Sequence, residues 1–453
     1  MNSTALAIDS LFADLINPHL DYAPIPFWFW NDDLDPSELR RQLHAFREGG
    51  FGGVVIHPRI GLSARIGYLT DAYFRLVRLV VDECAALGLR VILYDEGSYP
   101  SGSACGRVVA ANPDFAAHAL VSVRKDFSGP WRGYWRPTAG RSLVNRLVGV
   151  VLARTSGGVI DPETVQLLPV EERGLVRLDL ADGAWRAIAC FDVPSGGHIR
   201  GVLPEQDDGS TLAPAAGDLL NPEAVATFVR LTHDAYARAL GPHLGTTVVA
   251  MFTDEPSPLG RGSRRDAWPY TPGFETSLAA KLGWSLSRVQ AWLPALWQDY
   301  GSETAAFRHA YTRAVQERLL DVFYRAQAEW CAQHGIALTG HPAESNDMDS
   351  LASFQWPGQD MVWRYVVPGD DTALAGPHSV APKAATSAAR AGGRRRIGTE
   401  LFGAYGWPLS LDEAKWLLDW HLVRGNNLFM PHALFYSVRD GRAFESEPDL
   451  ALH

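Results

Sequence analysis

Two glutamates stand at the ends of short apolar segments and could act together as an acid and a base. Glu255 closes the run MFTDE, and Glu400 closes the run RRIGTE. A partly desolvated carboxyl has a raised pKa and suits a general acid, whereas a neighbouring cation or hydrogen-bond donor keeps a second carboxyl ionised. Such a pair is what cleavage of a glycosidic bond requires. A single glutamate of this kind is more often a salt-bridge or cap residue, so the hypothesis depends on the pair.

Other polar and aromatic side chains follow the same kind of apolar segment and are candidate substrate-binding residues. Asp95 and Glu96 could bind sugar hydroxyls or a cation, or could form a turn that caps a helix. Trp407, seven residues after Glu400, is the tryptophan most readily assigned to stacking on a sugar ring. The full candidate set is Trp30, Asn31, Asp32, His57, Arg59, Asp95, Glu96, Asp254, His341, Glu344, Trp407, His432 and Tyr436.

The elements that must position these residues alternate between strands and helices. Asp35-Pro36 and Asn221-Pro222 are helix starts with a capping residue and a proline at the first helical position. Uniformly apolar strands between helices indicate a parallel sheet covered on both sides. Strands are expected at 25–30, 53–56, 90–94, 246–252, 336–339, 366–371, 395–398 and 427–430.

This alternation predicts an α/β protein with a (β/α)8 TIM barrel, whose carboxyl strand ends would meet at one mouth. Residues 20–112 would form strands one to three and residues 219–440 strands four to eight. Between them, residues 113–218 read as a β-rich insertion after strand three. Residues 441–453 read as a tail, and no eighth helix is expected after Tyr436. A piece of a longer enzyme, or closure by a partner subunit, stays open.

Composition excludes several classes of function. The net charge of −10 and the lack of a Lys/Arg block argue against a nucleic-acid or anionic-membrane partner. No run of 18 apolar residues and no secretory signal occur, which predicts a cytoplasmic protein. The four cysteines form no CxxC pair, and the absence of HExxH, GxGxxG and Walker A patterns argues against zinc and nucleotide cofactors. Calcium ligands have no compact signature outside EF-hands. Nothing in the sequence indicates the oligomeric state.

Several ordered motifs resemble the catalytic barrel of glycoside hydrolase family 106, the α-L-rhamnosidases. They are FWFWNDDLDPSELRRQLHAFREGGFGGVVIHPRIGL, LGLRVILYDEGSYPSG, DLLNPEAVATFVRLTHDAY, MFTDEPS and IGTELFGAYGWPLSLDEAKWLLDWHLVRGNNLFMPHALFYS. The resemblance implies an inverting, calcium-dependent enzyme acting on a rhamnosylated glycoside, with Glu255 as general acid and Glu400 as general base. It places no calcium ligand. Members of the family are longer, with β-sandwich domains after the barrel that have no counterpart here.

Two other functions use the same residues. In a retaining glycosidase of the large barrel clan, of β-galactosidase or β-glucuronidase type, Glu400 would be a nucleophile. The two carboxyls would then lie about 5–5.5 Å apart instead of about 6.5–9.5 Å. Asp254 argues against this clan, which typically has asparagine before the acid. The second alternative is an inactive or truncated barrel that only binds carbohydrate.

Overall fold

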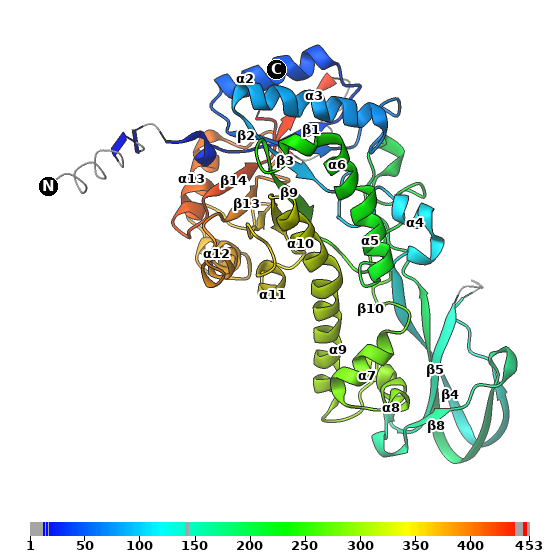
Figure 1. Ribbon diagram of the computed structural model, residues 1–453. Coiled ribbons are helices and arrows are strands. Elements are labelled where there is room, and N and C mark those ends of the chain that lie inside the picture. The colour runs from blue at the N-terminus through cyan, green and yellow to red at the C-terminus, as the bar shows by residue number, and fades with distance from the viewer. Residues whose placement is uncertain (1–11, 14, 17, 141–144, 440–446, 451–453) are drawn as a thin grey trace.

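The computed structural model describes residues 12–13, 15–16, 18–140, 145–439 and 447–450 (Figure 1). Its centre is a sheet with the strand order β11-β9-β3-β2-β1-β15, in which every neighbouring pair is parallel. Helices lie between consecutive strands of this sheet. The strands are β1 (Phe27–Trp30), β2 (Gly53–Pro58), β3 (Arg90–Tyr94), β9 (Val248–Asp254), β11 (Ala337–His341) and β15 (Leu434–Phe435).

A second, shorter parallel sheet contains β12 (Asp360–Met361), β13 (Gly398–Leu401) and β14 (Leu428–Pro431). One chain segment joins the two sheets, because β14 pairs with β13 while β15 pairs with β1 only a few residues later. On the other side, residues 356–359 bond to both sheets: Trp356 N–H donates to Leu338 O at 3.1 Å, and Gly398 N–H donates to Pro357 O at 2.8 Å. The molecule is therefore a mixed α/β fold of parallel strands and helices, and its closure into a complete barrel stays a prediction.

Helix ends follow local sequence signals. Asp35 caps α2 (Pro36–Glu48) by accepting from Ser37 N–H at 2.8 Å, and Asn221 caps α5 (Pro222–Leu231) in the same way. Gly88 ends α3 (Asp71–Leu87) in the left-handed conformation with φ 70°. The other helices around the parallel strands are α6 (His233–Leu240), α10 (Arg325–Gln333), α12 (Ala381–Ala391) and α13 (Leu411–Leu422).

The first strand divides its aromatic side chains between two cores, because successive residues of a strand face opposite sides. Phe27 and Phe29 belong to a cluster among the parallel strands, where they contact His432 with ring centroids 4.7 and 5.3 Å away. Trp28 and Trp30 belong to the cluster between strands and helices. All four side chains are completely buried.

Where the sequence predicts a β-rich insertion, the structure has a long antiparallel sheet. It pairs β4 (His118–Trp135) with β8 (Val176–Pro194), and β8 with β5 (Arg146–Ser156). Figure 1 shows this sheet extending away from the parallel strands, with α7 (Phe274–Leu282) and α8 (Leu286–Trp292) beside it. A strand from a distant part of the chain, β10 (Trp268–Tyr270), also pairs with β4, which the sequence reading did not foresee.

The predicted sixth strand at 366–371 is wrong. Those residues form turns, with Gly369 at φ 77° and Asp370 capping a short helix over Asp371–Ala373. The strand next to β13 is β12, which has only two residues and no β-branched run to reveal it. Tyr365, Val366 and Val367 have a composition typical of a strand, but they precede the turn at Pro368-Gly369 and form no strand.

A long helical stretch before β11 consists of α9 (Thr304–Leu319), a π-helical turn over Leu320–Tyr324, and α10. In the predicted tail (441–453), residues 441–446 and 451–453 lie outside the described residues. The described tail residues run beside β15, where Ala433 N–H donates to Pro448 O at 3.1 Å. In the part of the chain that the structure describes, no helix is long and apolar enough to cross a membrane.

Candidate active site

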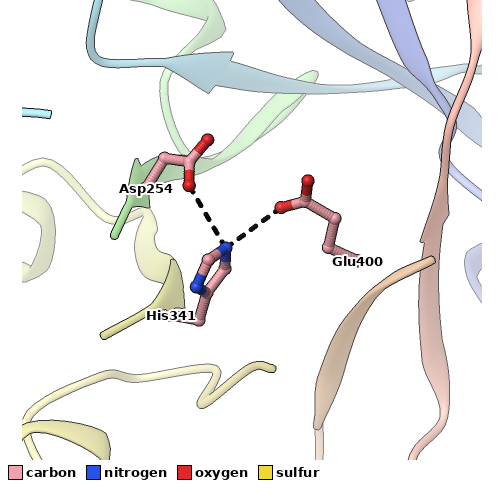
Figure 2. Close-up of side chains that lie close together, drawn as sticks. All are labelled: Asp254, His341 and Glu400. Atoms are coloured by element: carbon pink, nitrogen blue, oxygen red, sulfur yellow. Dashed lines mark hydrogen bonds and ion pairs between the residues drawn. The ribbon is translucent and has the colours of Figure 1, made fainter. Parts of the chain in front are cut away.

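The carboxyl ends of four parallel strands bring one cluster of ionisable side chains together. Asp254 ends β9, His341 ends β11, Glu400 lies in β13, and His432 directly follows β14. Figure 2 shows the His341 ring between the carboxylates of Asp254 and Glu400, with its Nε2 atom 3.3 Å from Asp254 Oδ1 and 3.1 Å from Glu400 Oε2. Glu255 is the next residue after Asp254, so both predicted catalytic glutamates belong to this end of the sheet.

Glu400 is a buried carboxylate held between two imidazoles. Its Oε1 atom is 2.6 Å from His432 Nε2, and its Oε2 atom is 3.1 Å from His341 Nε2. Burial alone would raise the pKa of Glu400, but the charges and hydrogen bonds of His432 and His341 lower it well below its usual value. Glu400 is therefore ionised at neutral pH.

The two histidines are correspondingly positive. Burial disfavours the charged form of His432, but the charges of Glu447 and Glu400 outweigh it and raise its pKa to about 10. The pKa of His341 is also raised well above its usual value, against the effect of burial, by hydrogen bonds to Asp254 and Glu400. Oε2 of Glu447 lies 3.0 Å from Nδ1, the other ring nitrogen of His432. Nη2 of Arg59 lies 3.4 Å from Oε1 of Glu447. This chain of alternating charges fixes the orientation of His432.

Glu255 has a different environment. Its side chain is 34% exposed, against 7% for Glu400. Desolvation and the adjacent charge of Asp254 raise the pKa of Glu255 to about 7, against the lowering effects of His341 and Arg261. Its backbone has φ 32°, an unusual value for a residue with a side chain. Near neutral pH, Glu255 can thus donate a proton while Glu400 can accept one.

Both glutamates line a pocket of about 450 Å³. Its polar wall also contains Asp360, whose pKa is raised well above its usual value by burial and then by the charge of Glu400. The Oδ1 atom of Asp360 has no hydrogen-bond partner among the described residues. A neutral carboxyl in this position can offer a hydroxyl to a ligand. The lining residues are Arg59, Tyr99, Arg200, Asp207, Asp208, Asp254, Glu255, Arg261, Asp360, Val362, Trp363, Glu400, Gly403, Ala404, His432 and Glu447.

Of the sequence-predicted residues, Glu255, Glu400, Arg59, Asp254 and His432 line this pocket, and His341 contacts two of them. His57 is buried against Tyr94, with ring centroids 3.9 Å apart and ring planes tilted by 37°. The pKa of His57 is well below its usual value, through burial and then the charge of Arg59, so His57 is neutral.

Several predicted substrate-binding residues have structural roles instead. Asn31 is buried and exchanges two hydrogen bonds with the backbone of Ser437. Glu96 accepts hydrogen bonds from five backbone N–H groups in the loop that follows it, but the N-cap of the next helix, α4 (Arg107–Ala111), is Gly106 and not Glu96. Asp95 is completely buried and accepts from Ser101 Oγ at 2.5 Å.

The remaining candidates also lie away from the pocket lining. The prediction that Trp30 binds substrate is wrong, because the alternation of side chains along β1 points Trp30 into the helix layer, against Tyr73. Tyr436 belongs to the same layer, and its hydroxyl accepts from Asp35 N–H at 2.9 Å. Trp407 is 59% exposed and is not among the residues that line the pocket. The exposed Glu344 and the half-buried Asp32 do not line it either.

Sequence reasoning missed a large part of the pocket. Arg200, Asp207 and Asp208 follow the antiparallel sheet, a region assigned to an insertion and not to the mouth. Asp360 begins a two-residue strand without a hydrophobic signal, and Glu447 comes from the predicted tail. Trp363 also lines the pocket and was not among the residues assigned to binding. In the sequence, the acidic pair Asp207-Asp208 shortly after Arg200 is the local cluster of charge that could have indicated this part of the pocket.

The spacing of Asp254, His341 and Glu400 could also hold a metal ion, since one ligand atom from each lies within 4.8 Å of the others. This set has one nitrogen and two oxygens, whereas Ca²⁺ takes six to eight oxygen ligands. Its imidazole nitrogen already bonds both carboxylates. The three residues therefore do not fit a calcium cage, and we assign no metal ligand among them.

Comparison with known proteins gives a likeness of fold. No family model and no curated protein sequence matches the chain. A solved structure of a rhamnosidase from Novosphingobium sp. PP1Y matches with a TM-score of 0.67 and 15% identity, over 94% of this chain and 56% of that one. The chain has the fold of that rhamnosidase. It spans little more than half of that protein's length.

Two more distant structures also match. The catalytic domain of a beta-amylase from Paenibacillus polymyxa has a TM-score of 0.38 and 11% identity, over 93% of this chain and 95% of that one. A GH20 exo beta-N-acetylglucosaminidase from Vibrio harveyi has a TM-score of 0.34 and 9% identity, over 83% and 41%. Likenesses of this degree add nothing to the argument about the site.

Proposed function

We propose that the chain is a glycoside hydrolase that cleaves a terminal glycosidic bond, that of an α-L-rhamnoside, with inversion at the anomeric carbon. The observation that carries the proposal is the contrast between two glutamates in one pocket: Glu255 is one-third exposed beside Arg261, whereas Glu400 is buried and bonded to His341 and His432. Glu255 has a pKa raised to about 7, while Glu400 is held ionised between His341 and His432. This difference separates an acid from a base in glycoside cleavage.

In the proposed reaction, Glu255 donates its proton to the oxygen of the leaving group as the glycosidic bond breaks. Glu400 accepts a proton from a water molecule, whose oxygen attacks the anomeric carbon from the opposite face. The sugar is released with inverted configuration, Glu255 ends as a carboxylate and Glu400 as a carboxylic acid, and exchange with solvent resets both. Asp360, as a neutral carboxyl, would hydrogen-bond a sugar hydroxyl.

The choice of rhamnoside rests on two supports. One is the motif resemblance around Glu255 and Glu400, and the other is the likeness of fold to the Novosphingobium protein. We also propose that the two parallel sheets form one closed (β/α)8 barrel. The segment from β14 to β15 and the backbone bonds of residues 356–359 support this closure.

A retaining mechanism is the second candidate, because one feature of Glu400 favours it. A carboxylate whose pKa is held low by two fixed imidazolium donors is oriented and always ionised, as a nucleophile must be. Glu255 would then serve as acid in the first step and as base in the second. The configuration of the first-formed product distinguishes the two mechanisms.

The calcium requirement implied by the family resemblance is a separate proposal. The proposed reaction has no metal-dependent step, because the spacing-matched set of Asp254, His341 and Glu400 does not provide an all-oxygen site. A chelator titration tests the requirement directly.

The test is turnover of a panel of nitrophenyl glycosides, led by α-L-rhamnoside, by wild type, Glu255→Gln and Glu400→Gln. We expect rhamnoside turnover by wild type and a loss of about 10²-fold or more in each variant, because general acid–base catalysis contributes about 10²–10⁴-fold. Turnover of another glycoside instead would keep the site and change the substrate. A folded wild-type protein that binds sugars but turns over none of them would identify a carbohydrate-binding barrel and contradict the proposal.

A further inference from the structure

Arg261 lies between Glu255 and the loop that follows the antiparallel sheet. Its Nη1 atom is 3.6 Å from Glu255 Oε1. Its Nε atom donates to both carboxylate oxygens of Asp208, at 2.9 and 3.1 Å, and its Nη2 atom donates to Oδ2 at 2.6 Å. A guanidinium held by a carboxylate in this forked arrangement has a fixed plane as well as a fixed position.

The backbone around Arg261 is fixed to the same loop. Arg261 N–H donates to His198 O at 2.8 Å, and His198 N–H donates to Arg261 O at 3.0 Å. Gly262 lies against the His198 ring so closely that a Cβ atom there would be 2.5 Å from its Cε1 atom. The segment after Glu255 and the loop after β8 are therefore bonded and packed directly against each other.

A second arginine–aspartate pair lies beside the first. Arg200 Nε donates to Asp207 at 2.6 Å, and its Nη1 atom donates to the Tyr99 hydroxyl at 2.8 Å. The guanidinium carbons of Arg200 and Arg261 lie 5.2 and 5.1 Å from the centre of the Tyr99 ring. One aromatic ring thus orders both pairs along the wall of the pocket.

We propose that Arg261 is a positioning residue for Glu255, and that the loop of residues 198–208 holds Arg261 in place through Asp208. The inference rests on the proposed role of Glu255 as the acid. Once Glu255 has given up its proton, its carboxylate stands next to the charge of Asp254, and the guanidinium offsets that repulsion. Arg261 also restrains the carboxyl, which is one-third exposed, in a single orientation.

Stability and positioning can be separated at this site. Arg261 and Asp208 are 36% and 39% exposed, and ion pairs this exposed contribute little to folding. Variants of either residue should therefore fold. Arg132 and Asp179 form a comparable pair on the antiparallel sheet, 2.6 Å apart and more exposed, and supply a matched control outside the pocket.

The experiment compares kcat/KM of wild type, Arg261→Met, Arg261→Lys, Asp208→Asn and Arg132→Met on two aryl glycosides of the sugar that wild type turns over. Dinitrophenolate leaves without a proton, whereas unsubstituted phenolate needs one. We expect Arg261→Met to lose about 10–100-fold with the phenyl substrate and less than about 3-fold with the dinitrophenyl substrate, as befits a partial loss of general-acid catalysis. Arg261→Lys should recover part of the loss, and Asp208→Asn should show the same pattern more weakly.

Equal losses on both substrates, or no loss on either, would overturn the inference. So would the same pattern in Arg132→Met. A second readout is the alkaline limb of kcat/KM against pH, which Arg261→Met should move to higher pH because a cation is removed from beside Glu255. If Glu255→Gln is impaired with the phenyl substrate and Arg261→Met is not, only this inference fails. If Glu255→Gln matches wild type, the proposed function itself fails.

Discussion

The Nε2 atom of His432 lies 2.6 Å from Oε1 of Glu400, and the opposite ring nitrogen of His432 is bound to Glu447. Glu447 comes from the very end of the described chain, and the other two residues come from neighbouring strands. The charge on the proposed base is therefore maintained, through His432, by Glu447, a residue that lies outside the parallel strands. Replacing His432 tests this relationship most directly.

For His432→Gln, we expect a rise in the pKa of Glu400 and a shift of the acidic limb of kcat/KM to higher pH. The free energy of unfolding should fall by about 3–5 kcal/mol, because a buried charge pair loses one partner. The folded-state pKa of His432 is raised from 6.5 to about 10, so its contribution is complete below pH 6.5 and is lost as the pH rises toward 10. Urea unfolding at several pH values should show the gap to wild type narrowing across that range. A constant gap would contradict the pKa assigned to His432.

If the proposed activity holds, the pH profile of the wild-type protein should reflect both glutamates. Activity should fall above about pH 7, where Glu255 loses the proton it must donate. The groups that face Glu255 and set this limb are Asp254, His341, Arg261 and Glu400. The acidic limb should lie below the usual pKa of a glutamate, because that of Glu400 is lowered. An alkaline limb that Glu255→Gln leaves unchanged would assign it to another group.

Inversion predicts that the first sugar released has the anomeric configuration opposite to that of the substrate. Proton NMR during the first minutes of hydrolysis, before mutarotation, measures this. A product of retained configuration would identify Glu400 as a nucleophile. Azide would then restore turnover to a Glu400→Gly variant by taking the place of the missing carboxylate, and the product would be the glycosyl azide of inverted configuration. Neither result changes the role of Glu255 in the first step.

Two tryptophans with the same exposure should differ in function. Trp363 and Trp407 are 61% and 59% exposed, but only Trp363 lines the pocket. Trp363→Ala should raise KM several-fold, since stacking contacts contribute about 0.5–1.5 kcal/mol. Trp407→Ala should leave KM within about twofold and the unfolding free energy within about 0.5 kcal/mol. The reverse result would restore Trp407 as the sugar platform that its sequence position suggested.

Removing metal ions with a chelator tests the proposed calcium requirement separately from acid–base catalysis by the two glutamates. If the family's calcium requirement applies here, EDTA should abolish turnover, excess Ca²⁺ should restore it, and the melting temperature should rise with added Ca²⁺. Full activity after exhaustive chelation and dialysis would show that the imidazolium–carboxylate cluster works without a metal.

The parts of the site that could be predicted are those that depend on a few consecutive residues of the sequence. Asp254 ends the apolar strand β9, Glu255 follows it, and Glu400 lies near the end of β13. Asp35 and Asn221 are helix caps that the sequence indicates directly. What could not be predicted depends on long-range contact. No residue near Glu447 in the sequence indicates its contact with His432, and the two-residue strand β12 is too short to show an alternation of apolar and polar residues. Trp30 was misassigned because a completely apolar strand does not reveal which face looks inward.

The two glutamates also differ in depth, with Glu400 7% and Glu255 34% exposed. On the proposed assignment, the sugar enters first and its leaving group stays toward solvent. The pocket therefore constrains the end unit of a substrate, while the rest of a chain or aglycone can be of any size. Release then has a fixed order: the aglycone departs through the mouth first, and the free monosaccharide behind it follows. Product inhibition should accordingly be competitive for the sugar and weak for the aglycone.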